Sequence, residues 1–169
     1  RALAVGLSEP TVTDSGQPFA PLAFVPKELS ALAEQLPNSK ILLDQAFTFE
    51  NFKQAFQETP FNILHLATHG QFTTIPEETF VITATEQPGQ SRRLTFGELE
   101  TLIRTTSPNA DPIDLLTLTA CETATGDDRA TLGLAGVAIR AGARSAIASL
   151  WKVEDASAAQ LISQFYENL

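Results

Sequence analysis

The sequence predicts an α/β fold with three layers, in which helices cover both faces of a mainly parallel, Rossmann-like sheet. Short apolar runs alternate along the chain with segments that have helical spacing of apolar side chains, as in β-α-β units. The apolar runs are continuous rather than alternating, which is typical of strands buried on both faces. A length of 169 residues, with 43% hydrophobic and 18% charged residues, fits one globular domain with its own core. We therefore expect residues 1–169 to form a single domain, and the absence of methionine indicates an excerpt of a longer protein.

Five strands are expected in the sheet, each an apolar run bounded by turn residues. They are predicted at Ala2–Leu7, Ile41–Leu43, Ile63–Ala67, Leu115–Thr119 and Ser145–Leu150.

Five helices are expected between and after these strands, and four have a recognisable start. Pro26 is typical of a first helical turn, Thr48 and Asp155 of N-caps, and Thr95 with Glu98 of a capping box. The remaining helix, at Leu132–Ala141, is rich in Gly and Ala, which favours close packing on a sheet. The predicted ranges are Lys27–Leu36, Phe49–Glu58, Phe96–Arg104, Leu132–Ala141 and Ala156–Asn168.

Two segments do not fit this alternation. Ser8–Phe24 contains three prolines and a glycine and is predicted to be an irregular loop. Gln71–Arg93 contains one strand-like run, Phe80–Ala84, between turn signals. We expect this second segment to be a small excursion at the end of the main sheet.

Two of the predicted strands end in side chains that carry chemistry. The run ending at Ala120 leads into Cys121, the only cysteine, and the run ending at Ala67 leads through Thr68 into His69 and Gly70. Reactive groups commonly stand at the carboxyl ends of strands in open α/β sheets. If the two strands are neighbours, a nucleophile and a base meet at one edge. The alternative is that Cys121 is a small buried hydrophobic residue.

A Cys–His pair at this edge has a coherent chemistry. A histidine can hold the thiolate as an ion pair and later protonate a leaving amine. The backbone N–H groups of Gly70 and Cys121 are candidates for an oxyanion hole, and Gly70 allows close approach of the substrate. The formal charge of −9 opposes the thiolate, so the histidine and local N–H dipoles must outweigh it.

Other chemistries are disfavoured by the motifs. His65 and His69 are four residues apart, about 13 Å along a strand, which is too far to share one metal ion. His65 is predicted to be a buried, hydrogen-bonded structural residue. Gly126, Gly133 and Gly136 do not form the dinucleotide-binding motif G-x-G-x-x-G, and the P-loop motif G-x-x-x-x-G-K-[ST] does not occur, so nucleotide binding is disfavoured. The motif G-x-S-x-G of serine hydrolases does not occur either. We expect no metal and no cofactor.

The net charge indicates which classes of partner are expected, and the cysteine count indicates which cellular compartment. A net charge of −9 argues against nucleic acid or an anionic membrane and suits cationic peptides or basic protein surfaces. No apolar run approaches the roughly 20 residues that cross a bilayer. One cysteine fits a reducing compartment, so we expect a cytoplasmic protein.

The motifs around these residues resemble the CHAT domain, a caspase-like and separase-related family common in bacteria and often linked to TPR repeats. The resemblance is carried by His65–Gly70, Leu118–Gly126, Ala141–Asp155 and Phe165–Leu169, and it extends from about Phe24 to Leu169. It implies a caspase-like sheet of strand order 2-1-3-4-5-6 and a catalytic dyad of His69 and Cys121. It also implies a sixth strand beyond Leu169, whose absence here would leave Ser145–Leu150 as an open edge able to pair with another chain.

The resemblance also bears on the substrate. Leu150–Asp155 is similar to a separase segment whose acidic residues help bind a basic P1 side chain, and Asp155 matches the acidic position best. Trp151 and Glu122, beside the nucleophile, are further candidates for substrate binding. Asp155 is also a helix cap, and the two roles are compatible.

We therefore predict a cysteine endopeptidase that acts on protein substrates, adjoining a TPR-type repeat domain. The alternative is a non-catalytic caspase-like interaction module attached to that repeat domain. A third, weaker hypothesis is an acyl transferase that uses the same dyad.

Overall fold

The computed structural model describes residues 1–71, 73, 78–106, 112–119, 139, 142–148 and 155–169. Its main sheet has five strands, and every neighbouring pair is parallel. Across the sheet the order is β10-β9-β5-β1-β4. The strands are β1 (Ala2–Gly6), β4 (Lys40–Leu43), β5 (Ile63–Ala67), β9 (Leu115–Thr119) and β10 (Ser145–Ala148). The predicted α/β class, with a mostly parallel sheet, is confirmed.

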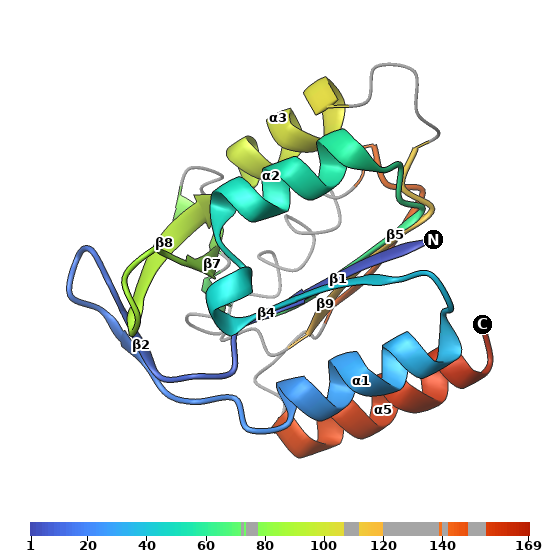
Figure 1. The fold of residues 1–169 in the computed structure, drawn as a ribbon, viewed down its shortest axis with the longest axis horizontal. Helices are drawn as coiled ribbons and strands as arrows, with labels where there is room; N and C mark the ends of the chain where they lie inside the picture. The colour runs from blue at the N-terminus through green and yellow to red at the C-terminus, as the bar shows by residue number, and fades with distance from the viewer. Residues whose placement is uncertain (72, 74–77, 107–111, 120–138, 140–141, 149–154) are drawn as a thin grey trace.

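Helices cover both faces of this sheet. One layer pairs α1 (Val25–Gln35) with α5 (Asp155–Glu167), and the other pairs α2 (Phe49–Glu58) with α3 (Phe96–Thr106) (Figure 1). These are four of the five predicted helices, with ends within a few residues of the predicted ones. The fifth, predicted at Leu132–Ala141, lies largely outside the described residues.

The helix starts follow the local signals in the sequence. Pro26 lies in the first turn of α1. The Thr48 hydroxyl accepts a 3.2 Å hydrogen bond from the Asn51 N–H and caps α2. In the capping box of α3, Glu98 accepts from the Thr95 N–H at 2.9 Å, and Thr95 accepts from the Glu98 N–H at 3.3 Å. These bonds satisfy N–H groups that the helix itself leaves without partners.

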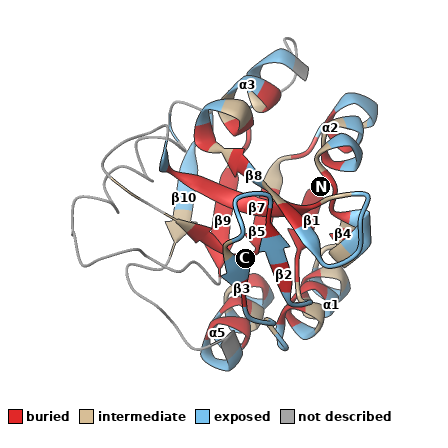
Figure 2. Ribbon diagram, turned by 90° about the vertical axis from the view of Figure 1, so that its left-hand side faces the viewer, coloured by how far each residue is buried: buried red, intermediate tan, exposed pale blue. Residues whose placement is uncertain are grey.

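The core consists of one apolar cluster on each side of the sheet, and both sides of the central strands are buried (Figure 2). Under α2 and α3 the rings of Phe47, Phe52, Phe56 and Phe61 pack edge to face in succession. Under α1 and α5 the sheet presents small side chains such as Ala2 and Ala4, so these helices approach closely. The continuous apolar strands of the sequence follow from burial on both faces.

A second sheet lies beyond the carboxyl edge of the main sheet, where the excursion at Gln71–Arg93 was expected (Figure 1). Its order is β3-β2-β8-β7-β6, and only the β2–β8 pair is parallel. The predicted strand Phe80–Ala84 is β7 and is confirmed. The other strands are β2 (Thr11–Thr13), β3 (Pro18–Phe19), β6 (Gly70–Gln71) and β8 (Gln90–Thr95).

The prediction of an irregular loop over Ser8–Phe24 is therefore wrong for β2 and β3. These strands have two or three residues and carry no apolar pattern of their own. Pairing with β8, far along the chain, holds β2 in place, and β2 in turn pairs with β3. In these strands, tertiary pairing rather than local β-propensity determines the backbone conformation.

The far edge of the main sheet is β10, where Ser145 and Ala146 are exposed. Within the described part of the chain the main sheet has no sixth strand. Residues 149–150, the predicted end of the fifth strand, lie outside the described residues.

Candidate active site

His69 stands at the carboxyl edge of the main sheet, two residues after β5 ends at Ala67. Its side chain is buried, with 8% of the residue exposed, and its Nε2 lies 2.7 Å from the carbonyl oxygen of Ala20. A carbonyl oxygen only accepts hydrogen bonds, so Nε2 carries the proton of this bond. In the neutral ring Nδ1 is then the basic nitrogen, which is the arrangement that a general base needs.

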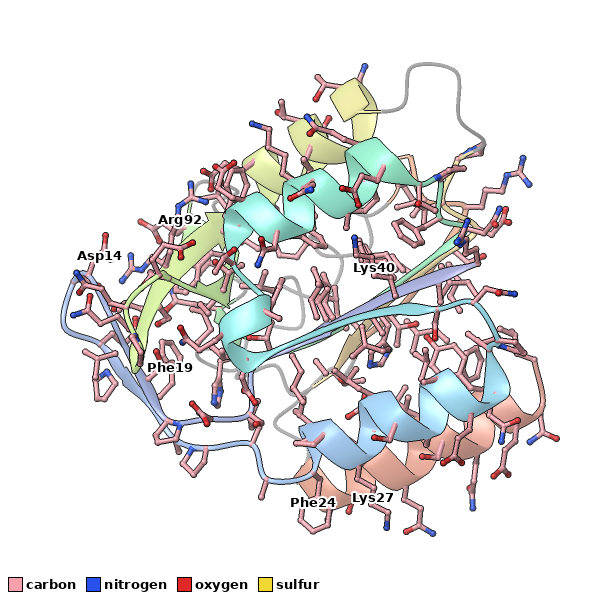
Figure 3. All side chains as sticks on the ribbon, in the orientation of Figure 1. Asp14, Phe19, Phe24, Lys27, Lys40 and Arg92 are labelled. Carbon is pink, nitrogen blue, oxygen red and sulfur yellow. The ribbon has the colours of Figure 1, made fainter. Side chains whose placement is uncertain are left out.

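The second sheet supplies the surroundings of the His69 ring. Phe19, the last residue of β3, packs against the imidazole with ring centroids 4.9 Å apart and a tilt of 33°. Figure 3 labels Phe19 where the chain leaves the small sheet on its way to α1. One short segment therefore contributes both the ring that packs on His69 and the carbonyl that orients it. Neither contact has a local signal in the sequence, because any residue type can offer a carbonyl and Phe19 is far from His69 along the chain.

Gly70 follows as the first residue of β6 and is buried. The Ile82 N–H donates to the His69 carbonyl at 2.9 Å, so His69 and Ile82 form a hydrogen-bonded pair of the antiparallel ladder. Gly70, opposite Val81, is in the next pair, whose members do not bond to each other. The N–H of Gly70 therefore points away from β7.

The partner strand of the predicted dyad is β9. In the parallel β5–β9 pair Ala67 is level with Thr119, the last described residue before Cys121. Cys121, Glu122 and Trp151 lie outside the described residues. Asp155 is the first residue of α5, but its side chain is not among those described.

A buried carboxylate beneath this edge contacts both strands. Glu28, in the first turn of α1, is 1% exposed, and its Oε1 accepts a 2.7 Å hydrogen bond from the Thr119 hydroxyl. The same oxygen lies 2.9 Å from Nε2 of His65 in β5, without the alignment of a hydrogen bond. The other carboxylate oxygen of Glu28, Oε2, has no hydrogen-bond partner among the described residues. The signal for Glu28 was its spacing, since it shares a helix face with Val25 and Leu32, whereas Lys27 projects away from the sheet (Figure 3).

Tyr166 of α5 completes this buried network. Its hydroxyl lies 3.3 Å from Nδ1 of His65 and shares a 3.1 Å hydrogen bond with Thr117. Burial raises the pKa of Tyr166 to about 12, and the nearby Glu28 carboxylate adds to the rise. His65 is fully buried, and its Nδ1 has the Tyr166 hydroxyl as a hydrogen-bond partner, as predicted for a buried, hydrogen-bonded histidine.

Among the described residues, no group of three or more His, Cys, Asp or Glu is arranged to hold a metal ion. No helix in the same part of the chain is long and apolar enough to cross a membrane. A groove between α2 and α3, lined by Phe49, Lys53 and Leu102, does not include His69.

No curated protein matches the chain. The family model for the CHAT domain matches residues 1–169, the whole chain. The α/β architecture of this chain, with its mostly parallel main sheet, is consistent with the caspase-like fold of that family. The chain therefore belongs to the CHAT domain family.

Proposed function

We propose that the protein is a cysteine endopeptidase in which Cys121 is the nucleophile and His69 the general base. The observation that carries the proposal is the register of β5 and β9. Ala67 and Thr119 are level in adjacent parallel strands, and each precedes its candidate catalytic residue by two positions. Equal offsets from level residues favour side chains at one height on one edge. The orientation of the His69 ring by Ala20 supports the same proposal.

The reaction proceeds in two stages. The Cys121 thiolate attacks the scissile carbonyl carbon and forms a C–S bond, the C–N bond breaks, and His69 gives its proton to the departing amine. Water then attacks the thioester and loses a proton to His69. As water adds to the carbonyl carbon, the C–S bond breaks, the carboxyl product leaves and the Cys121 thiolate is regenerated beside protonated His69. Nε2–H donates to the Ala20 carbonyl in both stages, so the ring keeps one orientation while Nδ1 gains and loses the proton.

The negative charge that develops on the scissile oxygen needs N–H donors. Gly70 is proposed as one donor, since its N–H points away from β7, and the backbone N–H of Cys121 as the other. Loss of a single such donor typically costs about a hundredfold or more in rate.

For the substrate we propose a protein or peptide with a basic P1 side chain. Asp155, at the start of α5, is the proposed acidic partner, with Glu122 and Trp151 as further contacts. The net charge of −9 favours approach of a cationic substrate. An adjacent TPR-type repeat domain and a cytoplasmic location remain part of this proposal.

The test uses the full-length protein and a peptide library with varied P1 residues. Wild type should cleave, while Cys121→Ala and His69→Ala each lose cleavage and keep the far-ultraviolet circular dichroism of the wild type. A peptide with a carbonyl electrophile should label wild type and fail to label Cys121→Ala. Retained cleavage in Cys121→Ala contradicts the dyad. Neither cleavage nor labelling in wild type favours the non-catalytic module, and transfer of the acyl group to an added amine instead of water favours the acyl transferase.

A further inference from the structure

Asp44 joins the ends of two strands beside the candidate site. It follows β4, and its Oδ1 accepts hydrogen bonds from the backbone N–H of Ser8 at 2.6 Å and of Glu9 at 3.2 Å. The Ser8 hydroxyl adds contacts to Oδ1 at 3.0 Å and to Oδ2 at 2.9 Å. Ser8 comes two residues after β1 ends at Gly6. One carboxylate therefore fixes the point at which the chain leaves the main sheet.

The same point anchors the segment that orients His69. The Ser8 carbonyl accepts a 2.9 Å hydrogen bond from the Leu22 N–H, and Leu22 is half-buried against the core beneath α1. Ala20, two residues before Leu22, is exposed and gives its carbonyl to Nε2 of His69. Ala20 thus lies in a short stretch held by β3 before it and by the Ser8–Leu22 bond after it. Ser8 in turn is held by Asp44.

The backbone of Asp44 indicates that its side chain has a purpose beyond the turn. Its φ is +51°, in the left-handed region that glycine adopts without steric cost. A turn alone would accept glycine at this position. The side-chain oxygen that glycine lacks accepts the bonds from Ser8 and Glu9. Strained positions of this kind concentrate around functional sites.

We propose that Asp44 is a positioning residue for His69, which acts through Ser8 and Leu22 on the carbonyl of Ala20. The inference rests on the proposed role of His69 in peptide cleavage. Without the Asp44 contacts, the Ala20 carbonyl has fewer restraints and the imidazole loses its fixed orientation. Small displacements of a catalytic group can lower the rate by about a hundredfold.

The variants separate the side chain from the backbone conformation. Asp44→Gly deletes the acceptor and suits the positive φ, whereas Asp44→Asn keeps a side-chain carbonyl acceptor and also tolerates this conformation. Ser8→Ala removes the hydroxyl contacts and keeps the backbone N–H donor. Thr48→Ala removes the cap of α2, which destabilises the fold without touching the Asp44–Ser8–Leu22 contacts. It is the control for loss of stability alone.

Two measurements are made on the full-length protein. One is the separation of kcat from KM for a cleaved peptide. The other is the ring N–H proton signal of His69 in NMR spectra, identified by its absence from His69→Ala. Asp44→Gly should lower kcat by about ten- to a hundredfold with KM nearly unchanged, and its His69 ring N–H should exchange faster with solvent. Asp44→Asn and Thr48→Ala should stay within about threefold of wild type, and Ser8→Ala should fall between.

The outcomes distinguish the two proposals. An unchanged His69 signal and kcat in Asp44→Gly, or in Ser8→Ala if Asp44→Gly does not fold, overturns the positioning role. A kcat loss in Thr48→Ala equal to that in Asp44→Gly overturns it as well, because stability alone then explains the effect. If wild type cleaves no peptide but its His69 signal still responds to Asp44→Gly, the peptidase proposal fails and the positioning of the ring stands.

Discussion

The hydroxyl of Thr119 donates a 2.7 Å hydrogen bond to the carboxylate of Glu28, and both side chains are buried. Thr119 ends the strand that leads to Cys121, and Glu28 belongs to the helix layer beneath it. The same carboxylate oxygen lies 2.9 Å from His65, in the strand that leads to His69. One buried acid therefore contacts both strands of the proposed dyad.

Thr119→Val tests this contact, because valine keeps the shape of threonine and removes the donor. Leaving a buried acceptor without its donor costs about 1–3 kcal/mol, so the free energy of unfolding in urea should fall by that amount. Thr105→Val is the control, since its hydroxyl bonds the Thr101 carbonyl on an exposed face of α3. The control should change stability by less than about 0.5 kcal/mol. Equal effects of both substitutions would show that the Glu28–Thr119 bond contributes nothing.

Tyr166, the only tyrosine in the chain, gives a direct pH measurement. Its folded-state pKa of about 12 exceeds the ordinary value of 10.0, because burial disfavours the phenolate. Between these values the unfolded chain releases a proton that the native state retains, so alkali favours unfolding. The contribution of Tyr166 to the free energy of unfolding is fully present below about pH 10. It declines by about 2–3 kcal/mol as the pH rises toward about 12.

The measurement is the ultraviolet absorbance of the phenolate against pH. The midpoint should lie well above that of the urea-unfolded protein. Tyr166→Phe should lack both the absorbance change and this part of the alkaline loss of stability. Coincident midpoints in the native and unfolded states would show that the hydroxyl is not held in the buried network.

Gly6 tests the close contact between β1 and α1. A Cβ at this position would lie 2.6 Å from Cγ1 of Val25 and 3.0 Å from Cδ1 of Leu29. Gly6→Ala should therefore destabilise the fold by about 1–3 kcal/mol through overpacking. Gly97→Ala in α3 is the matched control, because among the described residues its added Cβ would meet no atom within 4 Å beyond its chain neighbours and its own helix backbone, and alanine favours helix. A melting temperature of Gly6→Ala equal to or above that of Gly97→Ala would contradict this packing.

The proposed P1 specificity gives a kinetic prediction. Peptides with Arg or Lys at P1 should be cleaved with a higher kcat/KM than matched peptides with Leu. Asp155→Asn should reduce that advantage by about tenfold or more, since a charge-assisted contact is lost. Equal rates for Arg and Leu in wild type would remove Asp155 from the substrate-binding site.

The sequence was informative wherever the structure depends on local signals or continuous burial. Thr48 caps its helix, Thr95 and Glu98 form their capping box, and His65 is the buried histidine that the strand pattern indicated. These features depend on residues within one turn of helix or on a run buried on both faces. A short stretch of sequence is therefore sufficient to predict these caps and this buried strand.

The features that the sequence did not reveal depend on partners far along the chain. The strand β2 exists because β8 pairs with it, and the carbonyl of Ala20 orients His69 without any requirement on residue type. Glu28 lies on the buried face of its helix, but its partners Thr119 and His65 come from strands far along the chain. Each of these contacts is fixed by tertiary packing, which local propensity does not contain.

Activation of Cys121 by His69 can be measured through the pH dependence of alkylation of the thiol. The rate at which iodoacetamide modifies Cys121, followed by peptide mass, is compared in wild type and His69→Ala. A thiolate held by an imidazolium reacts in mild acid, whereas an isolated thiol reacts only as it ionises near about pH 8.5. Wild type should react at about pH 6 at least tenfold faster than His69→Ala, and the two rates should converge in alkali. Superimposable pH profiles would contradict the dyad.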